Sequence, residues 1–279
     1  MVMVLPPPKF DSVALVAKVV AERQNGKNRA FFNSIATEWE QRVQHYVNSC
    51  GSPAAVPMWP AVAARRTTLL NLYSAPGDGV QASILKAMRT HELILCPACG
   101  EAGHPNTLDH YLPKGKFPHF CITPANLFPM CDACQGAKKE KTGDAASPRF
   151  FVHPYYDVFV ANQVLQLQIG APPFTTPSFQ LNVAPGLSAV ESALVQTHAR
   201  ELEIEARYAA FFRGIYRRML RHVAVMRASD QDVIASLTAS RAAYAHPSKN
   251  GWEHLFYDAV LSNPALLTYL TTDDLPTYL

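Results

Sequence analysis

The chain has 279 residues, of which 48% are hydrophobic and 17% are charged, with a formal net charge of +3. This composition lies far from the low-hydrophobicity, high-charge range of disordered chains, so we expect a folded protein. No apolar run approaches the roughly 18 residues that span a bilayer, and no basic segment precedes the apolar start as in a signal peptide, so a cytoplasmic location is expected.

Residues 1–90 are predicted to form a helical N-terminal region. Apolar residues recur at helical spacing in residues 11–24, and a second helical stretch covers residues 34–47. Prolines and glycines interrupt the pattern at residues 51–60 and 76–79, before a further helix that should end near Thr90.

Residues 91–158 differ in kind, being rich in Pro, Gly, Cys and Lys. Four of the six cysteines form two CxxC pairs, a spacing that places two thiolates on a tight turn. A single CxxC is also compatible with a redox pair, whereas two such pairs favour a structural metal over four unrelated buried cysteines. We therefore predict a module held by one zinc ion, with the ligands Cys96, Cys99, Cys131 and Cys134.

Between the two CxxC pairs, a short apolar strand ends in adjacent acidic and imidazole side chains, Asp109 and His110. Neighbouring residues of a strand point to opposite faces, so both can serve one site only if the strand ends or bends there. Pro113 and Gly115 make such a bend expected.

These residues resemble the HNH, or His-Me finger, endonucleases. The features shared with the zinc-bound branch of that family are, in order, a CxxC, an apolar-Asp-His-x-x-Pro-Lys strand, an Asn-Leu-x-Pro loop, and a second CxxC with a Lys-bearing helix. The resemblance covers residues 93–157. It implies a ββα-metal finger that holds one divalent cation, Mg²⁺ or Mn²⁺, against the scissile phosphate.

The resemblance also implies roles for individual residues. His110 matches the general base that activates water, Asp109 matches the metal-binding residue beside it, and Asn126 matches the asparagine that fixes the base by hydrogen bonding. These roles are chemically reasonable, because a neutral imidazole accepts a proton near physiological pH and a carboxylate suits a hard cation.

One position departs from the family pattern. The residue directly after the second CxxC is usually His or Asn, and here it is Gln135, whose carbonyl oxygen is on a longer arm. A further ligand to the catalytic cation could come from His153 or Asp157. His104 and His119 match no position of the pattern and are expected on loops or the surface.

The lysines of the module concentrate positive charge as contact with a phosphate backbone would require. A lysine cluster is equally typical of the solvated face of a helix. The candidates for nucleic-acid contact are Lys114, Lys138 and Lys139, and Lys114 lies nearest the Asp-His pair.

Residues 159–279 are predicted to form a β-hairpin followed by helices. Residues 160–169 and 179–183 alternate apolar and polar side chains, as strands do. A capping box, Ser188 with Glu191, opens a long helix or bent helix pair to about Val225. A second capping box, Ser229 with Asp232, opens another helix, and residues 252–270 read as one or two more.

The sequence thus predicts an α+β protein, mainly helical, with a central zinc-stapled ββα-metal finger and a short β-hairpin. The predicted function is a metal-dependent endonuclease acting on DNA, with RNA left open. Stand-alone proteins of this branch resemble bacterial antiphage or mobile-element defence effectors, often beside an ATPase partner. The alternative is a non-catalytic zinc module that binds nucleic acid or a protein.

Overall fold

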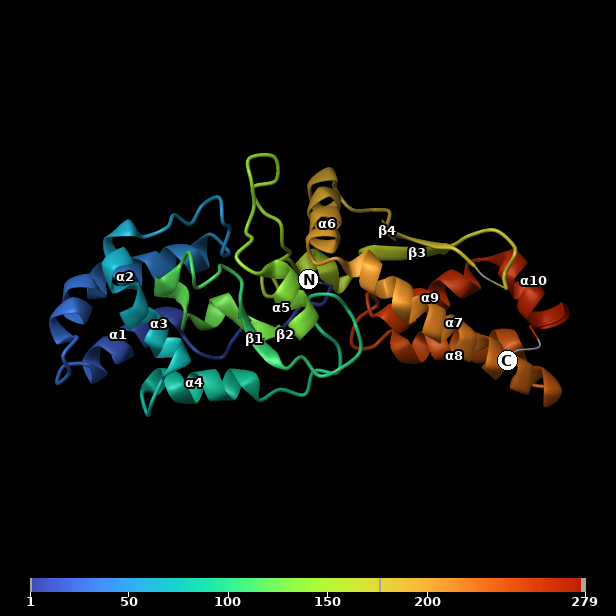
Figure 1. Ribbon diagram of the computed structural model, residues 1–279, viewed down its shortest axis with the longest axis horizontal. Helices are drawn as coiled ribbons and strands as arrows, with labels where there is room; N and C mark the ends of the chain where they lie inside the picture. The colour runs from blue at the N-terminus through green and yellow to red at the C-terminus, as the bar shows by residue number, and fades with distance from the viewer. Residues whose placement is uncertain (1, 176, 277–279) are drawn as a thin grey trace. The chain divides into compact units, whose positions relative to one another are not determined.

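The computed structural model describes residues 2–175 and 177–276. Helices dominate these residues, and two separate antiparallel hairpins, β1–β2 and β3–β4, supply the strands (Figure 1). The predicted α+β, mainly helical fold class is therefore confirmed. Two compact units are present: the finger unit, residues 4–98 and 103–157, and the C-terminal unit, residues 2–3, 99–102 and 158–276.

The finger unit begins with four helices that pack around aromatic and aliphatic side chains. These helices are α1 (Ser12–Glu22), α2 (Arg29–Asn48), α3 (Arg66–Ser74) and α4 (Val80–Arg89), and a 3-10 turn, η1 (Pro60–Arg65), precedes α3. The carboxylate of Asp11 accepts the first free N–H groups of α1, which fixes where that helix begins. Trp39, Val43 and Tyr46 of α2 are fully buried and form its core face.

The chain then forms a hairpin and a short helix in the order ββα. Strand β1 (Thr107–His110) pairs antiparallel with β2 (Leu127–Met130), and α5 (Asp132–Lys138) follows. In Figure 1 this helix lies next to the two strands. The loop between the strands contains two 3-10 turns, η2 (Pro118–Phe120) and η3 (Pro124–Asn126).

Helix α2 holds the loop between β1 and β2 through long aromatic side chains. Trp39 Nε1 donates to the carbonyl of His119 at 2.7 Å, and the Tyr46 hydroxyl lies 3.3 Å from the carbonyl of Ala125. His119 lies in this loop, as one of the two expected positions has it, but it is completely buried and not at the surface. Its ring packs against those of Trp59 and Phe120, with centroid distances of 5.3 and 4.0 Å.

In the residues of the C-terminal unit that the structure describes, there are the second hairpin and five helices. Strands β3 (Leu165–Ile169) and β4 (Phe179–Val183) pair in register from Leu165 opposite Val183 to Ile169 opposite Phe179. Burial alternates along β3, as the sequence pattern predicts, although the strand begins at Leu165 and not at residue 160. A 3-10 turn, η4 (Val158–Ala161), precedes β3, and the helices are α6 (Ala189–Glu201), α7 (Ile204–Ala228), α8 (Val233–Tyr244), α9 (Trp252–Leu261) and α10 (Pro264–Thr272).

Two details of this region sharpen the sequence prediction. The capping box of Ser188 and Glu191 is confirmed, whereas the second one is wrong because Asp232 is itself the N-cap and accepts from Ala235 N at 2.9 Å. The long helical pattern that begins at Ser188 is a pair of helices, because Glu203 adopts a left-handed backbone conformation with φ of 55° and thereby separates α6 from α7.

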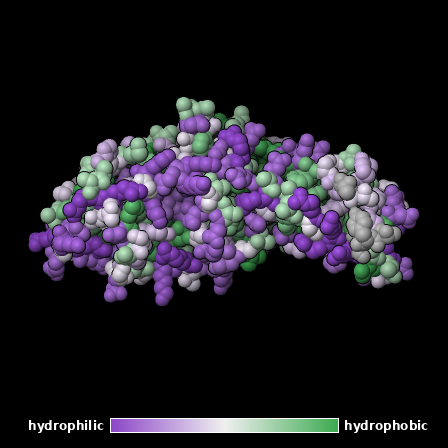
Figure 2. All heavy atoms as spheres, viewed as in Figure 1, coloured by the Kyte–Doolittle hydropathy of each residue, from purple (hydrophilic) through white to green (hydrophobic). Residues whose placement is uncertain are grey.

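Among the described residues, no helix is both long and apolar enough to cross a membrane. The face of the molecule shown in Figure 2 carries mainly hydrophilic residues, with hydrophobic ones in small scattered groups.

Candidate functional site

Four cysteines converge in the structure as the two CxxC pairs predict. The Sγ atoms of Cys96, Cys99, Cys131 and Cys134 all lie within 4.8 Å of one another. Three of these cysteines are buried and Cys131 is partly exposed. Four thiolates at such distances match the ligand set of a tetrahedral structural site, so the cluster could hold a zinc ion.

The cluster fixes the junction between β2 and α5. Cys131 directly follows β2 and is the N-cap residue of α5, which brings Cys134 into the first turn of the helix. The backbone N–H of Cys131 points to Cys96 Sγ at 3.4 Å, as backbone donors do toward thiolates. Nearby, Asn106 Nδ2 donates to the Asp132 carboxylate at 2.6 Å. The start of α5 is thereby set relative to β1.

His110 ends β1 and is almost completely buried. Its Nε2 lies 2.9 Å from the carbonyl oxygen of Cys121. A carbonyl only accepts, so Nε2 carries the proton and Nδ1 keeps its lone pair. Among the described residues, Nδ1 has no hydrogen-bond partner. Burial lowers the pKa of His110 to about 4, so the imidazole is neutral at physiological pH and can accept a proton at Nδ1.

Asp109, directly before His110, is also buried and faces α5. Its Oδ2 lies 3.0 Å from Lys138 Nζ, and its Oδ1 lies 3.3 Å from Gln135 Nε2. Asp109 and His110 line the same pocket, so the end of the strand does bring both side chains to one site.

Lys138 is not at the surface, where the predicted contact with nucleic acid would require it. It is the last residue of α5, its side chain is buried, and its Nζ donates to the carbonyl of His110 at 2.6 Å. The ammonium also lies 5.7 Å from the centroid of the Phe151 ring. Asp109, the His110 carbonyl and this aromatic ring explain why a charged side chain is stable inside.

Asn126 is fully buried and bonds to backbone groups on the loop that follows His110. Its Oδ1 accepts from Leu112 N at 2.7 Å, and its Nδ2 donates to the carbonyls of Leu112 and Phe120 at 3.1 and 3.2 Å. Phe120 directly precedes Cys121, whose carbonyl binds the imidazole. Asn126 therefore positions His110 through the loop backbone, without a direct bond to its ring.

Gln135 faces Asp109, but His153 lies elsewhere in the unit. His153 is fully buried, with Nε2 3.1 Å from the Tyr46 hydroxyl and Nδ1 accepting from Tyr155 N at 3.2 Å. With both nitrogens engaged, His153 is not placed to join Asp109 in a cation site. Asp157, the other candidate, forms an ion pair with Arg149.

The pocket that contains Asp109 and His110 has a volume of about 280 Å³. The sequence does not predict two of its lining residues, Tyr73 and Glu140. Tyr73 of α3 places its ring edge-on to His110 at 4.5 Å between centroids, and its hydroxyl donates to the Leu108 carbonyl at 2.7 Å. Glu140 adds a second, exposed carboxylate. No local sequence signal marks either residue, because Tyr73 comes from a separate helix and Glu140 lies in a charged turn.

The two remaining predicted lysines do lie at this pocket. Lys114 is partly exposed, and its Nζ lies 4.4 Å from the centroid of the Tyr73 ring. Lys139 is exposed and lies directly after α5. Both side chains line the pocket, so positive charge does flank the Asp-His pair.

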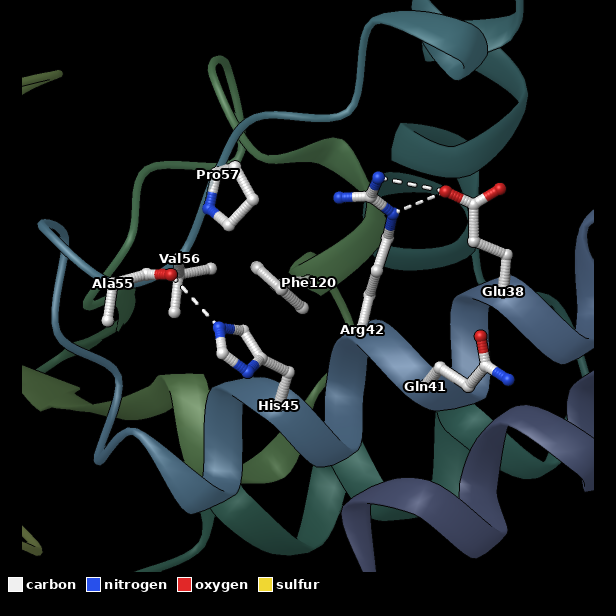
Figure 3. Close-up of a pocket in the computed structure, with 8 residues that line it drawn as sticks. All are labelled: Glu38, Gln41, Arg42, His45, Ala55, Val56, Pro57 and Phe120. Atoms are coloured by element: carbon white, nitrogen blue, oxygen red, sulfur yellow. Dashed lines mark hydrogen bonds and ion pairs between the residues drawn. The ribbon is translucent and has the colours of Figure 1, made fainter.

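A larger pocket of about 390 Å³ lies on α2 and does not contain any of these groups. Figure 3 shows Arg42 pointing toward Glu38, and His45 toward the backbone of Ala55. Arg42 pairs with Glu38 at 2.8 Å, and His45 Nε2 lies 2.9 Å from the carbonyl of Ala55. Because Arg42, Glu38 and His45 are engaged in this way, the pocket offers weaker chemistry than the Asp-His pocket.

Comparison with known proteins gives one partial likeness. A segment of 62 residues is 36% identical to protein ea31 of Escherichia phage lambda, which corresponds to 22% of this chain and 21% of that protein. The chain thus matches about a fifth of the length of that relative, and the relative's name states no activity. No protein-family model and no solved structure matches.

Proposed function

We propose that the protein is an HNH-type, metal-dependent endonuclease that hydrolyses phosphodiester bonds of DNA. The observation that carries the proposal is the ββα hairpin and helix in which His110 presents an uncommitted Nδ1 in the same pocket as the Asp109 carboxylate. The order of elements, the adjacent four-cysteine cluster and the flanking lysines all fit this reading.

In this mechanism His110 takes a proton from the attacking water at Nδ1. The bond from Nε2–H to the Cys121 carbonyl holds the tautomer in which Nδ1 is the acceptor, and it stabilises the imidazolium that forms. Asn126 holds the loop that carries this carbonyl, and Tyr73 packs against the ring. A positioned general base of this kind contributes roughly 10²-fold to 10⁴-fold in rate.

The donors around Asp109 suit a hard divalent cation. Among the described residues, Asp109 Oδ2 is buried and accepts no well-formed hydrogen bond, although an ammonium lies beside it. Mg²⁺ typically binds one or two carboxylates and retains waters and phosphate oxygens, so Asp109 would hold it. Gln135 would add its amide oxygen only after the side-chain amide rotates, since its Nε2 faces Asp109 in the structure. When bound, such a cation stabilises the charge that develops on the phosphate and the leaving oxygen.

The remaining features have supporting roles in the proposal. Zinc at the four cysteines would be structural, because a closed four-thiolate site leaves no open position for substrate. Lys114 and Lys139 would contact the phosphate backbone. The family resemblance further suggests a cytoplasmic antiphage or mobile-element defence effector with an ATPase partner. DNA is favoured over RNA on the same resemblance.

One observation favours a second candidate, a non-catalytic zinc module that binds nucleic acid or a protein. The Asp109 carboxylate is already neutralised by Lys138, and Gln135 replaces the shorter ligand of the family. A binding module needs the zinc alone, whereas the nuclease needs a second cation site at Asp109.

The decisive experiment compares His110→Ala with wild type in a plasmid nicking assay containing Mg²⁺ or Mn²⁺. We expect His110→Ala to lose at least about 100-fold in rate while its zinc content stays unchanged. His104→Ala is the matched control, since His104 is an exposed histidine of the same unit. Equal cutting by wild type and His110→Ala would show that a contaminant is responsible, and the binding module would replace the nuclease.

Two further variants test the metal assignments. Asp109→Ala should weaken the catalytic cation, so added Mn²⁺ should partly restore its rate. Gln135→Asn restores the shorter amide and should maintain or raise activity if Gln135 faces the cation.

A further inference from the structure

The most unusual charged group of the finger unit is Lys138, an ammonium buried beside the carboxylate proposed to bind metal. We propose that Lys138 is an internal cation that occupies Asp109 in the resting protein, so that a divalent cation binds there only when the lysine withdraws. This inference rests on the proposed function in one respect, namely that Asp109 is the metal ligand.

The geometry places the ammonium where a metal ion would have to approach. Lys138 Nζ lies 3.0 Å from Asp109 Oδ2 and 2.6 Å from the carbonyl oxygen of His110. The side chain of Lys138 is 2% exposed, so water does not replace these contacts. A carboxylate oxygen and a carbonyl oxygen on one positive charge are also the kind of donors that a hard cation takes.

The ammonium and a divalent cation cannot both occupy this position. Two positive charges a few ångströms apart repel strongly where water is excluded. The neutralised carboxylate also has less attraction to offer a second cation. Metal affinity at Asp109 is therefore lowered by Lys138, and the binding energy of the metal must first displace the lysine.

The surroundings of Lys138 permit such a displacement. Lys138 lines the same pocket as Asp109, and its side chain is a flexible four-carbon stem. Helix α5 ends at Lys138, since Lys139 has a left-handed φ of 47°. Glu140 places an exposed carboxylate on the same pocket, which provides a partner for the ammonium after it leaves Asp109.

Withdrawal of Lys138 would also release the backbone of His110. The 2.6 Å bond from Nζ to the His110 carbonyl is lost with the ion pair, because the same ammonium makes both contacts. Metal binding at Asp109 and the release of the His110 backbone are thereby linked through the side chain of Lys138. Without a divalent cation, the contacts of Lys138 with Asp109 and with the His110 carbonyl define the resting state.

The test measures Mn²⁺ binding directly, by the electron paramagnetic resonance signal of free Mn²⁺, with zinc-loaded full-length protein. We expect Lys138→Met to bind Mn²⁺ at least about 10-fold more tightly than wild type, which is about 1.4 kcal/mol. Lys138→Arg keeps the charge and should show no such gain. Asp109→Asn combined with Lys138→Met should lose the tight site. Equal affinities for wild type and Lys138→Met would overturn the proposal.

Lys138→Met leaves the Asp109 carboxylate buried without its partner and could fail to fold. Wild-type protein then provides the test through the ¹⁵N signal of the Lys138 ammonium during titration with Mg²⁺. The proposal requires this signal to shift toward that of an exposed lysine as Mg²⁺ binds. A Lys138 signal that stays unchanged at saturating Mg²⁺ would overturn it.

These readouts separate the inference from the proposed function. If the Mn²⁺ affinities change as expected but no form of the protein cuts DNA, the inference stands and the nuclease fails. If His110-dependent cutting occurs and Lys138→Met binds Mn²⁺ no more tightly, the inference fails alone.

Discussion

The two hairpins of this protein are alike in topology and opposite in how they are stabilised. Hairpin β3–β4 alternates buried and exposed residues along β3, so one face packs on a core and the other meets solvent. In β1–β2 seven of the eight residues are buried, including Asp109 and His110. A hairpin that is buried on both faces and includes polar side chains cannot rely on apolar alternation, and cysteines and aromatic side chains support it instead.

Both hairpins are nevertheless fixed by the same device, a fully buried asparagine. Asn250 accepts from the N–H groups of Val164 and Leu165 at 2.7 and 3.2 Å, and donates to the carbonyls of Val160 and Asn162. Asn126 does the same for the loop after β1. A buried asparagine that saturates backbone groups is thus a structural element, and only its proximity to His110 gives Asn126 a part in the proposed chemistry.

The largest contrast between the hairpins should follow from losing the zinc proposed at the four-cysteine cluster. Cys131→Ser should release the metal and unfold β1–β2, because the binding energy of a structural zinc, about 10 kcal/mol or more, is folding energy. Amide hydrogen exchange should show lost protection in β1–β2 and retained protection in β3–β4, alongside zinc content by elemental analysis.

Cys50→Ser is the matched control, since Cys50 is an exposed cysteine outside the cluster, and it should keep its zinc. Wild-type protein that is purified without zinc and still protects the β1–β2 amides would contradict the prediction.

Replacing the two asparagines should separate stability from chemistry. Asn126→Ala and Asn250→Ala each leave several buried backbone groups without hydrogen-bond partners. Each should therefore lower the free energy of unfolding by about 3 kcal/mol or more. Urea denaturation measures this loss. At temperatures where both variants remain folded, only Asn126→Ala should slow DNA cleavage, since only its loop carries the Cys121 carbonyl. An equal slowing by Asn250→Ala would remove the special role of Asn126.

The elements that the sequence predicted well are those with a local signal. Two CxxC pairs, the Asp109-His110 dipeptide and the alternation of residues 160–169, which becomes a strand from residue 165, each depend on near neighbours in the chain. The burial of Lys138 had no such signal. Lys138 and Lys139 are identical, adjacent residues in the sequence, yet Lys138 is buried and Lys139 is exposed to solvent. The positive φ of Glu203 was equally hidden, since neither glycine nor proline marks the break between α6 and α7.

Contacts between distant segments account for the rest of the site. Tyr73 reaches His110 from α3, and Tyr46 engages His153 from α2. His153 is a metal candidate from the sequence because it lies close to the module along the chain. Its position is decided instead by aromatic packing, with the rings of Tyr111 and Tyr156 at 4.2 and 4.4 Å between centroids.

Lowering the pH should lower the free energy of unfolding of the finger unit through His119, which lies in the loop between β1 and β2. Burial, with a smaller effect of Arg42, lowers the pKa of His119 to about 3, and among the described residues neither ring nitrogen has a partner. The unfolded state, with an ordinary pKa of about 6.5, binds a proton first, so stability falls as pH drops from about 6.5 toward 3. At pH 5 this loss is about 2 kcal/mol.

His119→Leu removes the titrating group at similar size. The difference in unfolding free energy between pH 7.5 and pH 5 should therefore be about 2 kcal/mol smaller in His119→Leu than in wild type. The comparison is best made by urea denaturation at the two pH values. An unchanged pH dependence would mean that His119 binds a proton at pH 5 as readily in the folded protein as in the unfolded chain.

The smallest expected effect on stability is that of Lys114→Ala, and it isolates the role of surface charge at β1–β2. The cation–π contact of Lys114 with Tyr73 is partly exposed and should contribute only about 0.5 kcal/mol to folding. Binding to DNA should respond more, because one phosphate contact contributes about 0.9 to the slope of log affinity against log salt. That slope should fall by about this amount, as measured by fluorescence anisotropy with a labelled duplex over a range of salt concentrations.

Lys18→Ala, on the exposed side of α1 and outside the pocket, should leave the slope unchanged. If Lys114→Ala and Lys18→Ala behave identically, the charge beside the Asp-His pocket is an ordinary solvated surface and the DNA path lies elsewhere.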